Sequence, residues 1–272
     1  MPGAATAASD LFQEEEGAGE PLVLVHGSWS GAFTWGLAMP GLAGALRVIA
    51  YDRLGHGRSP APPSGPLARR RHEDDLATLI ERVAGGRAHV AGNSYGGSIA
   101  LGLASRRPEL FRSVSAHEPP LAGIAARDPI VERAVKDLET VGEIVEHGDP
   151  EAGARHFVEH VAIGPGTWPL LPPEIRQAMV RNAPALAAEL RDPEWADADR
   201  EALAELRMPI LLTQGDASLP WFAPIMEALA GAAPQAELVT IDGAGHAPHQ
   251  THPGEYAAIV SSFALDSKGT RR

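Results

Sequence analysis

The chain of 272 residues contains no cysteine. Disulfide bonds and thiol chemistry are therefore excluded, and cysteine usage says nothing about the redox compartment. No apolar run approaches the ~18 residues of a membrane-spanning helix. Met1–Asp10 carries no basic residue and no long apolar core, so it is unlike a signal peptide. We expect a soluble, cytoplasmic protein that does not bind membranes.

Basic residues are also scarce, because 23 Lys and Arg stand against 35 Asp and Glu, a formal net charge of −12. A nucleic-acid partner is not expected, since binding to phosphates requires a basic face. Histidines and acidic residues are scattered, without the paired spacing of metal ligands. We expect no metal and no cofactor. The sequence does not indicate an oligomeric state.

Hydrophobic residues make up 44% of the chain, enough for a proper core. Short apolar runs alternate with stretches of helical spacing, a pattern typical of an α/β protein with a parallel sheet. Strands are predicted at 9–16, 22–25, 47–51, 88–91, 112–116, 209–214 and 236–241, and helices at 35–46, 72–83, 98–106, 221–230 and 256–265.

The pattern changes between residues 121 and 206, where no strand-like run occurs. Apolar residues recur there at helical spacing in stretches that prolines and glycines interrupt. We predict about four helices, inserted between two strands of the sheet.

Gly92-Asn93-Ser94-Tyr95-Gly96 matches the G-x-S-x-G pattern and lies between an apolar run and a helical stretch. A serine on so tight a strand-to-helix turn has a strained backbone, and side chains two residues away on either side would clash. The turn lifts the hydroxyl above the sheet, beside the free N–H groups of a helix N-terminus. Ser94 is therefore predicted to be a nucleophile.

Several polar residues follow directly after predicted strands. Ligands of parallel sheets bind at the carboxyl ends of the strands, so these side chains are expected on one rim. The rim holds a nucleophile, a candidate base and three candidate acids among His26, Ser28, Asp52, Ser94, Glu118, Asp216 and His246.

Four segments in this order resemble the α/β-hydrolase family. They are His26-Gly27, residues 51–59 (YDRLGHGRS), residues 92–97 and Gly243-Ala244-Gly245-His246. The resemblance implies a mostly parallel eight-stranded sheet flanked by helices, with a helical cap inserted after the strand that follows the nucleophile. It places the core domain at residues 1–120 and 207–272 and the cap, or lid, at 121–206.

The resemblance also implies roles. Ser94 would attack, and His246 would be the general base, since a neutral imidazole near pH 7 is what serine activation needs. The backbone N–H groups of Tyr95 and Ser28 would form the oxyanion hole. His26 and Asp52 are expected to brace their own loops.

The triad acid departs from the common family pattern. The usual Gly-x-x-Asp register reads Gly215-Asp216-Ala217-Ser218, with serine in the acid's place. A minority of the family, including the zearalenone-type lactone hydrolases, carries the acid at the end of the preceding strand, where Glu118 stands. We predict that Glu118 orients His246 and stabilises its imidazolium, and we retain Asp216 as the alternative.

Aromatic residues of the rim and cap suggest a hydrophobic substrate, with Trp29, Trp168 and Trp221 as pocket candidates; packing of cap against core is the alternative. The leading hypothesis is a serine hydrolase that cleaves a carboxylic ester or lactone. The same triad could serve a carbon–carbon bond hydrolase or a lyase, and a ligand receptor on this fold is a third possibility. The sequence does not name the substrate.

Overall fold

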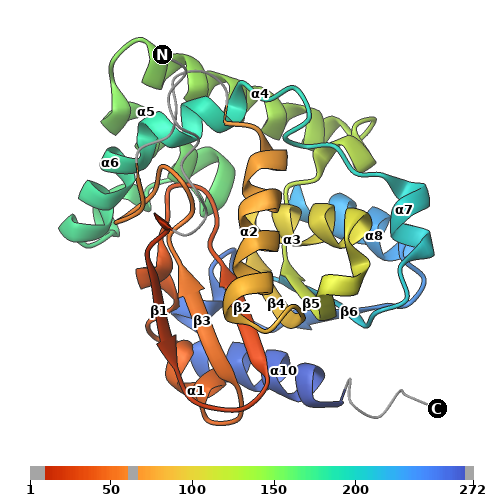
Figure 1. Ribbon diagram of the computed structural model, residues 1–272. Coiled ribbons are helices and arrows are strands. Elements are labelled where there is room, and N and C mark those ends of the chain that lie inside the picture. The colour runs from red at the N-terminus through yellow and green to blue at the C-terminus, as the bar shows by residue number, and fades with distance from the viewer. Residues whose placement is uncertain (1–9, 61–66, 267–272) are drawn as a thin grey trace, which may run out of the picture.

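A computed structural model describes residues 10–60 and 67–266 of the chain. Seven strands form one sheet in the order β1-β3-β2-β4-β5-β6-β7 (Figure 1). β1 pairs antiparallel with β3, and every other neighbouring pair is parallel. The strands are β1 Gln13–Glu16, β2 Pro21–Val25, β3 Arg47–Tyr51, β4 Ala88–Asn93, β5 Phe111–His117, β6 Ile210–Gly215 and β7 Ala236–Ile241.

The sheet confirms the predicted α/β-hydrolase architecture but has seven strands over the described residues, where the resemblance implied eight. Only one strand, β1, precedes the first parallel strand in this part of the chain. Gly17 and Gly19, both at positive φ, then turn the backbone into β2. Positive φ suits glycine because it has no Cβ.

Alternate residues of the central strands enter two separate cores. Val23 and Val25 of β2 belong to the cluster that packs under α2 and α3, whereas Leu22 and Leu24 belong to the cluster with α1 and α10. Successive side chains of a strand point to opposite faces, so a strand covered on both sides must be apolar throughout. This is why β2 is a continuous apolar run.

Helices cover both faces of the sheet, with α2 and α3 on one side and α1 and α10 on the other (Figure 1). The helices are α1 Met39–Ala43, α2 Arg69–Val83, α3 Tyr95–Arg106, α4 Pro129–Glu146, α5 Pro150–His156, α6 Pro173–Leu190, α7 Arg200–Glu205, α8 Phe222–Ala232, α9 Pro248–Thr251 and α10 Pro253–Asp266.

One predicted helix, at 35–46, is wrong. The structure has a 3-10 turn, Ala32–Trp35, followed by the short α1. Pro40 is the second residue of α1, and Gly36 and Gly44 flank that helix. Proline favours the first turn of a helix over its interior, and glycine weakens helices, so a longer helix is disfavoured here.

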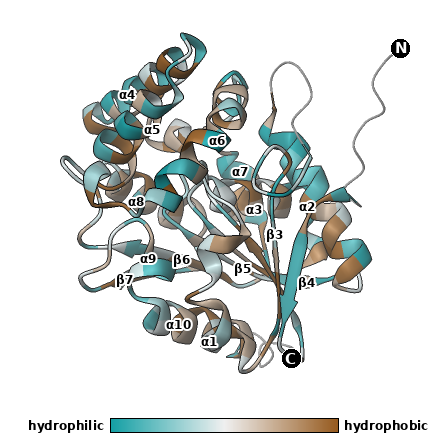
Figure 2. Cartoon of the chain, turned by 90° about the vertical axis from the view of Figure 1, so that its left-hand side faces the viewer, coloured by the Kyte–Doolittle hydropathy of each residue, from teal (hydrophilic) through white to brown (hydrophobic). Residues whose placement is uncertain are grey.

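The insert between β5 and β6, residues 121–206, contains α4 to α7 and no strand. Figure 2 shows both hydrophilic and hydrophobic colour along α4, as expected for a helix with one buried side. The number of helices agrees with the prediction, but their division does not. Prolines were expected to interrupt the helical stretches, but α6 runs through Pro184, and the short α7 was not foreseen.

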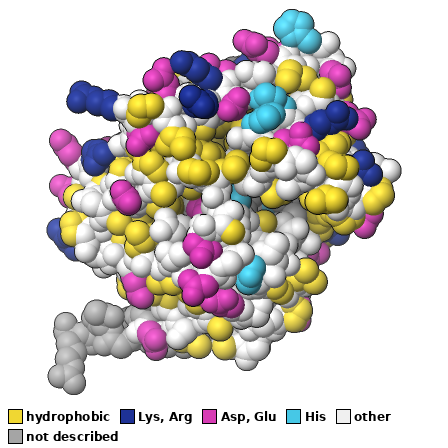
Figure 3. All heavy atoms as spheres, turned by 180° about the vertical axis from the view of Figure 1, so that it is seen from behind, with side chains coloured by type: hydrophobic (Ala, Val, Ile, Leu, Met, Phe, Trp, Pro, Cys, Tyr) yellow, Lys and Arg dark blue, Asp and Glu magenta, His cyan; other side chains and the backbone are white. Residues whose placement is uncertain are grey.

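No helix in the described part of the chain is long and apolar enough to span a membrane. On the face seen in Figure 3, acidic side chains are spread over the whole surface, and the basic ones lie mainly in the upper half, where the insert lies. Hydrophobic side chains are interspersed among them. This face carries no extended, purely basic surface of the kind that binds phosphates.

Six histidines are buried. Burial is the main reason why the pKa of five of them is lowered: His26, His56, His72, His117 and His249. The pKa of His56 and of His249 falls to about 3. The unfolded chain titrates its histidines near ~6.5, so below that pH it binds more protons than the folded chain. The free energy of unfolding should therefore decrease between about pH 6.5 and 5.5, by about 1 kcal/mol for each of His56 and His249.

Urea unfolding at about pH 7.5, 6.5 and 5.5, above the range in which carboxylates titrate, measures this loss. His56→Gln should reduce the dependence on pH. His147→Gln should leave it unchanged, because His147 is exposed. A free energy of unfolding that stays constant over this range contradicts the prediction.

Candidate active site

Ser94 lies on the turn between β4 and α3, with φ 54° and ψ −127°. The two flanking glycines are required there. A Cβ on Gly92 would overlap the backbone of Gly96, and a Cβ on Gly96 would overlap the carbonyl oxygen of Val25. Non-glycine residues rarely adopt positive φ, and such strain gathers at functional sites. The turn places Ser94 at the N-terminus of α3, at the carboxyl edge of the sheet.

Glu118 and His246 are joined by a short hydrogen bond. The Nδ1–Oε2 distance is 2.7 Å, although 128 residues separate the two in the chain. The second carboxylate oxygen, Oε1, accepts the backbone N–H of Gly215 at 2.9 Å. Both oxygens of Glu118 are thus held, and the imidazole leaves Nε2 as its second ring nitrogen. This is the arrangement that the acid and the base of a catalytic triad require.

The loop that carries His246 is fixed from two sides. Asn93, the neighbour of Ser94, donates its side-chain N–H to the carbonyl oxygen of His246 at 2.9 Å. The imidazole stacks on the ring of Phe222, with a centroid distance of 4.2 Å and an interplanar angle of 17°. These contacts fix the orientation of the imidazole relative to the turn that bears Ser94.

Glu118 is fully buried and has a positive φ of 41°. Burial by itself raises the pKa of this carboxyl, but hydrogen bonds and charge interactions with His117 and His246 outweigh burial and hold the pKa below its ordinary value. The carboxylate therefore stays ionised at neutral pH. An ionised carboxylate at Nδ1 favours the protonated imidazole that forms when a serine is deprotonated.

Asp216, the alternative acid, has a different partner. Its Oδ1 accepts the backbone N–H of Gly243 at 2.6 Å, and the residue is exposed. Asp216 thus stabilises the turn before His246, whereas Glu118 makes the contact with the imidazole.

The family profile of α/β hydrolases matches residues 22–259. The chain belongs to the α/β-hydrolase family. It is an enzyme of that family, and its relatives carry the names of hydrolases and esterases.

Three relatives illustrate the range of this family. The protein named putative carbamate hydrolase RutD, of Azorhizobium caulinodans, is 31% identical, with 97% of this chain and 98% of that one aligned. The pimeloyl-[acyl-carrier protein] methyl ester esterase of Aromatoleum aromaticum is 31% identical over 88% of this chain and 96% of its own. A thermophilic esterase from Thermogutta terrifontis superposes with a TM-score of 0.79 at 25% identity, covering 94% and 93% of the two chains.

A narrow cavity joins the site residues of this hydrolase. Its free volume is about 20 Å³, the room that one water molecule needs. Core and insert both contribute to its walls. Nine lining residues are apolar and five are polar: Pro120, Leu138, Phe157, Val161, Leu186, Leu190, Trp195, Trp221 and Phe222, with Ser28, Ser94, Tyr95, Glu189 and His246.

Of the three tryptophans expected in the pocket, only Trp221 is among the residues that line this cavity. Its indole N–H donates to the carbonyl oxygen of Val161 in the insert at 2.9 Å. Trp29 is buried behind the wall, with its ring 5.6 Å from that of Phe157. Trp168 is buried beneath the Arg176 guanidinium, at 5.9 Å. Trp29 of the core packs against Phe157 of the insert, as the alternative of cap-against-core packing proposed, whereas the contact of Trp168 with Arg176 lies within the insert.

Ser28 and Tyr95, the expected oxyanion-hole residues, line the cavity together with Ser94. His26 and Asp52 brace loops, as predicted. His26 Nε2 accepts the backbone N–H of Arg53 at 2.9 Å, and Asp52 accepts the N–H groups of Ala32 and Arg58 at 2.7 and 2.8 Å.

Glu189 was missed by the sequence interpretation. It lies in the last turn of α6, forms part of the cavity wall and is 2% exposed. The available signal was a single acid within the apolar stretch Ala183–Leu190.

Three possible metal ligands meet at the triad. In the described part of the chain, His117, Glu118 and His246 are the one group of at least three whose ligand atoms lie within 4.8 Å of one another. The Nδ1–Oε2 hydrogen bond uses two of these atoms. A metal ion would therefore compete with the bond that orients His246.

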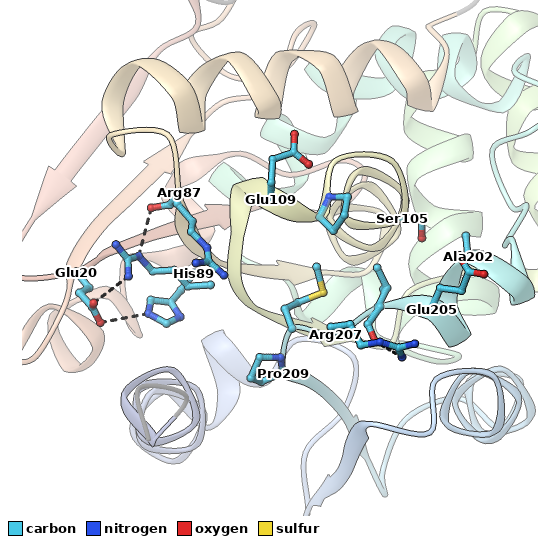
Figure 4. A pocket seen from close by; sticks show the side chains of 13 residues that line it. Glu20, Arg87, His89, Ser105, Glu109, Ala202, Glu205, Arg207 and Pro209 are labelled. Carbon is cyan, nitrogen blue, oxygen red and sulfur yellow. Dashed lines mark hydrogen bonds and ion pairs between the residues drawn. The ribbon is translucent and has the colours of Figure 1, made fainter. Parts of the chain in front are cut away.

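A wider pocket of about 610 Å³ lies at the opposite end of the sheet, where the strands begin (Figure 4). Glu20 pairs there with Arg112 at 3.1 Å and with His89 at 3.6 Å, and Arg87 donates to the carbonyl oxygen of Phe111. These charged groups pair with one another or with the backbone, and they lie at the other end of the strands from Ser94. The narrow cavity is the better candidate for the active site, because α/β enzymes use the carboxyl ends of their strands.

Proposed function

We propose that this α/β hydrolase cleaves a carboxylic ester or lactone of a hydrophobic small molecule through an acyl-enzyme on Ser94. The observation that carries the proposal is the 2.7 Å bond between Glu118 and His246, in a largely apolar cavity that Ser94 also lines. The esterases among the relatives support this substrate class.

In the proposed reaction, His246 Nε2 takes the hydroxyl proton of Ser94 as Oγ forms a bond to the substrate carbonyl carbon. The developing oxyanion accepts hydrogen bonds from the backbone N–H groups of Tyr95 and Ser28. His246 then returns the proton to the departing alcohol oxygen, and the C–O bond breaks. Water, deprotonated by His246, attacks the acyl-enzyme and releases the acid. Glu118 holds the imidazole in place throughout.

The insert at 121–206 is proposed to act as a lid over this site. It supplies Leu138, Phe157, Leu186 and Trp195 to the wall of the cavity. Because the free volume accommodates about one water molecule, a substrate enters only when these side chains or their helices move. We therefore propose that the described conformation is the closed one.

Rapid mixing with p-nitrophenyl esters of graded acyl length, alongside aromatic lactones, tests this function. An acyl-enzyme predicts a burst of p-nitrophenol close to one equivalent per chain when deacylation is slow, and a matching mass increase on the peptide that contains Ser94. A preference for one acyl length or ring begins to name the substrate. Turnover of none of these compounds, together with cleavage of a vinylogous diketone, favours the carbon–carbon hydrolase instead.

A further inference from the structure

Two polar residues of the cavity, Tyr95 and Glu189, have a buried side-chain atom that lacks a hydrogen-bond partner among the described residues and that the proposed chemistry does not use. Five polar residues line the wall. Ser94, His246 and Ser28 serve the attack, the proton transfer and the oxyanion. Tyr95 contributes only its backbone N–H to the oxyanion hole. The hydroxyl of Tyr95 and the carboxylate of Glu189 are left without a function.

Glu189 is bound through only one of its oxygens. Oε1 accepts from Arg53 Nη1 at 2.5 Å and lies 3.0 Å from His72 Nε2. These contacts fasten α6 of the insert to the core. Oε2 is buried and has no hydrogen-bond partner among the described residues. Leaving a buried carboxylate oxygen unpaired is costly, so the site favours a ligand that donates to it.

Tyr95 offers the complementary atom. Its hydroxyl is buried and also lacks a hydrogen-bond partner within the described residues. Burial, and next the negative charge of Glu189, raise the pKa of this hydroxyl well above its ordinary value. Tyr95 therefore remains protonated and able to donate. Tyr95 and Glu189 are neighbours of the same side chain, because Arg53 donates to Glu189 and its guanidinium carbon lies 5.2 Å from the Tyr95 ring centroid.

Glu189 remains an acceptor. Burial alone raises the pKa of its carboxyl, but Arg53, His56 and His72 outweigh burial and lower the pKa below the ordinary value. The charge of Glu189 disfavours an anionic ligand, and the guanidinium of Arg53, which lies 5.2 Å from the Tyr95 ring centroid, disfavours a cation. The two atoms therefore suit a neutral group that both donates and accepts a hydrogen bond.

We propose that the Tyr95 hydroxyl and Glu189 Oε2 form a polar subsite that selects substrates bearing a hydroxyl or carboxamide group near the scissile carbonyl. Glu189 accepts the O–H or N–H of this group, and Tyr95 donates to its oxygen. The inference rests on the proposed ester or lactone hydrolysis and narrows its substrate class. A site built to pair such a group discriminates strongly against analogues that lack it, because its own buried atoms then stay unpaired.

Matched p-nitrophenyl alkanoates test the subsite. Each chain length is compared as the unsubstituted, the hydroxyl-bearing and the acetamido-bearing ester, and the readout is the ratio of kcat/KM for substituted over unsubstituted ester. In the wild type this ratio should reach about 10- to 100-fold at one chain length, and Tyr95→Phe and Glu189→Gln should each lower it about tenfold.

Tyr51→Phe is the matched control. Tyr51 also has a buried hydroxyl without a hydrogen-bond partner in the described chain, but it lies on β3 and is not among the residues that line the cavity. The ratio of kcat/KM for substituted over unsubstituted ester should be the same in Tyr51→Phe as in the wild type. Glu189→Gln keeps an oxygen for Arg53, and Tyr95→Phe gives an independent reading if the Glu189 variant does not fold.

Hydrolysis of the esters without any preference in the wild type overturns the subsite alone. If Tyr95→Phe keeps the wild-type preference, the subsite is also overturned. The Tyr95 hydroxyl and Glu189 Oε2 would then be paired with an ordered water and not with the substrate. Hydrolysis of none of the esters overturns the proposed function as well.

Discussion

Replacing Ser94 by alanine should lower kcat for the best ester substrate by a factor of about 10⁴ to 10⁶. The reason is that Ser94 supplies the attacking oxygen from the strained turn before α3, with φ 54° at the residue itself. Without Oγ no acyl-enzyme can form, and only the oxyanion hole and the binding of substrate would still accelerate attack by water. Steady-state rates and the burst amplitude, measured beside the wild type, check this expectation.

Ser98→Ala is the matched control, because Ser98 lies in the first turns of the same helix and is fully buried. It should retain the burst. The Ser94→Ala chain should remain folded, since the substitution removes only one oxygen atom from a residue that lines the cavity. Equal rates in wild type and Ser94→Ala would show that another group performs the chemistry and would move the assignment to a lyase or a receptor.

Replacing Glu118 by glutamine should lower kcat by a factor of about 10³ to 10⁴. The carboxylate now accepts from His246 Nδ1 at 2.7 Å and leaves Nε2 unprotonated for Ser94. A glutamine amide that donates to Nδ1 reverses this arrangement, so that Nε2 carries the proton and no longer accepts one. The amide also fails to stabilise the imidazolium. Values of kcat across the pH range measure the loss.

Asp216→Asn supplies the comparison, because both carboxylates follow neighbouring strands. Its kcat should remain close to that of the wild type, since Asp216 contacts the backbone of Gly243 rather than the imidazole. A small loss of stability, on the order of 1 kcal/mol, is expected from the weakened turn. Near-normal turnover in Glu118→Gln combined with loss of turnover in Asp216→Asn would reverse the assignment of the acid.

The positions of the strands could be predicted from the sequence because their cause is local. β7 coincides with the predicted strand at 236–241, and β2 extends the predicted run at 22–25 by one residue, Pro21. A strand that is buried on both faces must be apolar throughout, so a continuous apolar run predicts such a strand. Ser94 was equally evident, because the G-x-S-x-G pattern of its turn is contained in five consecutive residues, although the glycine at 96 is also required by the nearby backbone of Val25.

The helix boundaries in the insert were harder to predict from the sequence, because packing there overrides local helix propensity. Pro184 would end an isolated helix, yet α6 continues through it from Pro173 to Leu190. Ala183 and Leu186, on either side of Pro184, are buried in the core cluster. Tertiary burial of this face compensates for the hydrogen bond that proline cannot make.

The sequence by itself determined the α/β architecture, the turn at Ser94 and the two carboxylates that could accompany His246. Only the tertiary structure decided which of them contacts the imidazole, because that depends on β5 lying beside β6, where Glu118 reaches both Gly215 and His246. It also brought Glu189 onto Arg53 across 136 residues and gave the cavity its polar wall. Contacts between distant segments follow from how the layers pack, and short-range patterns do not encode them.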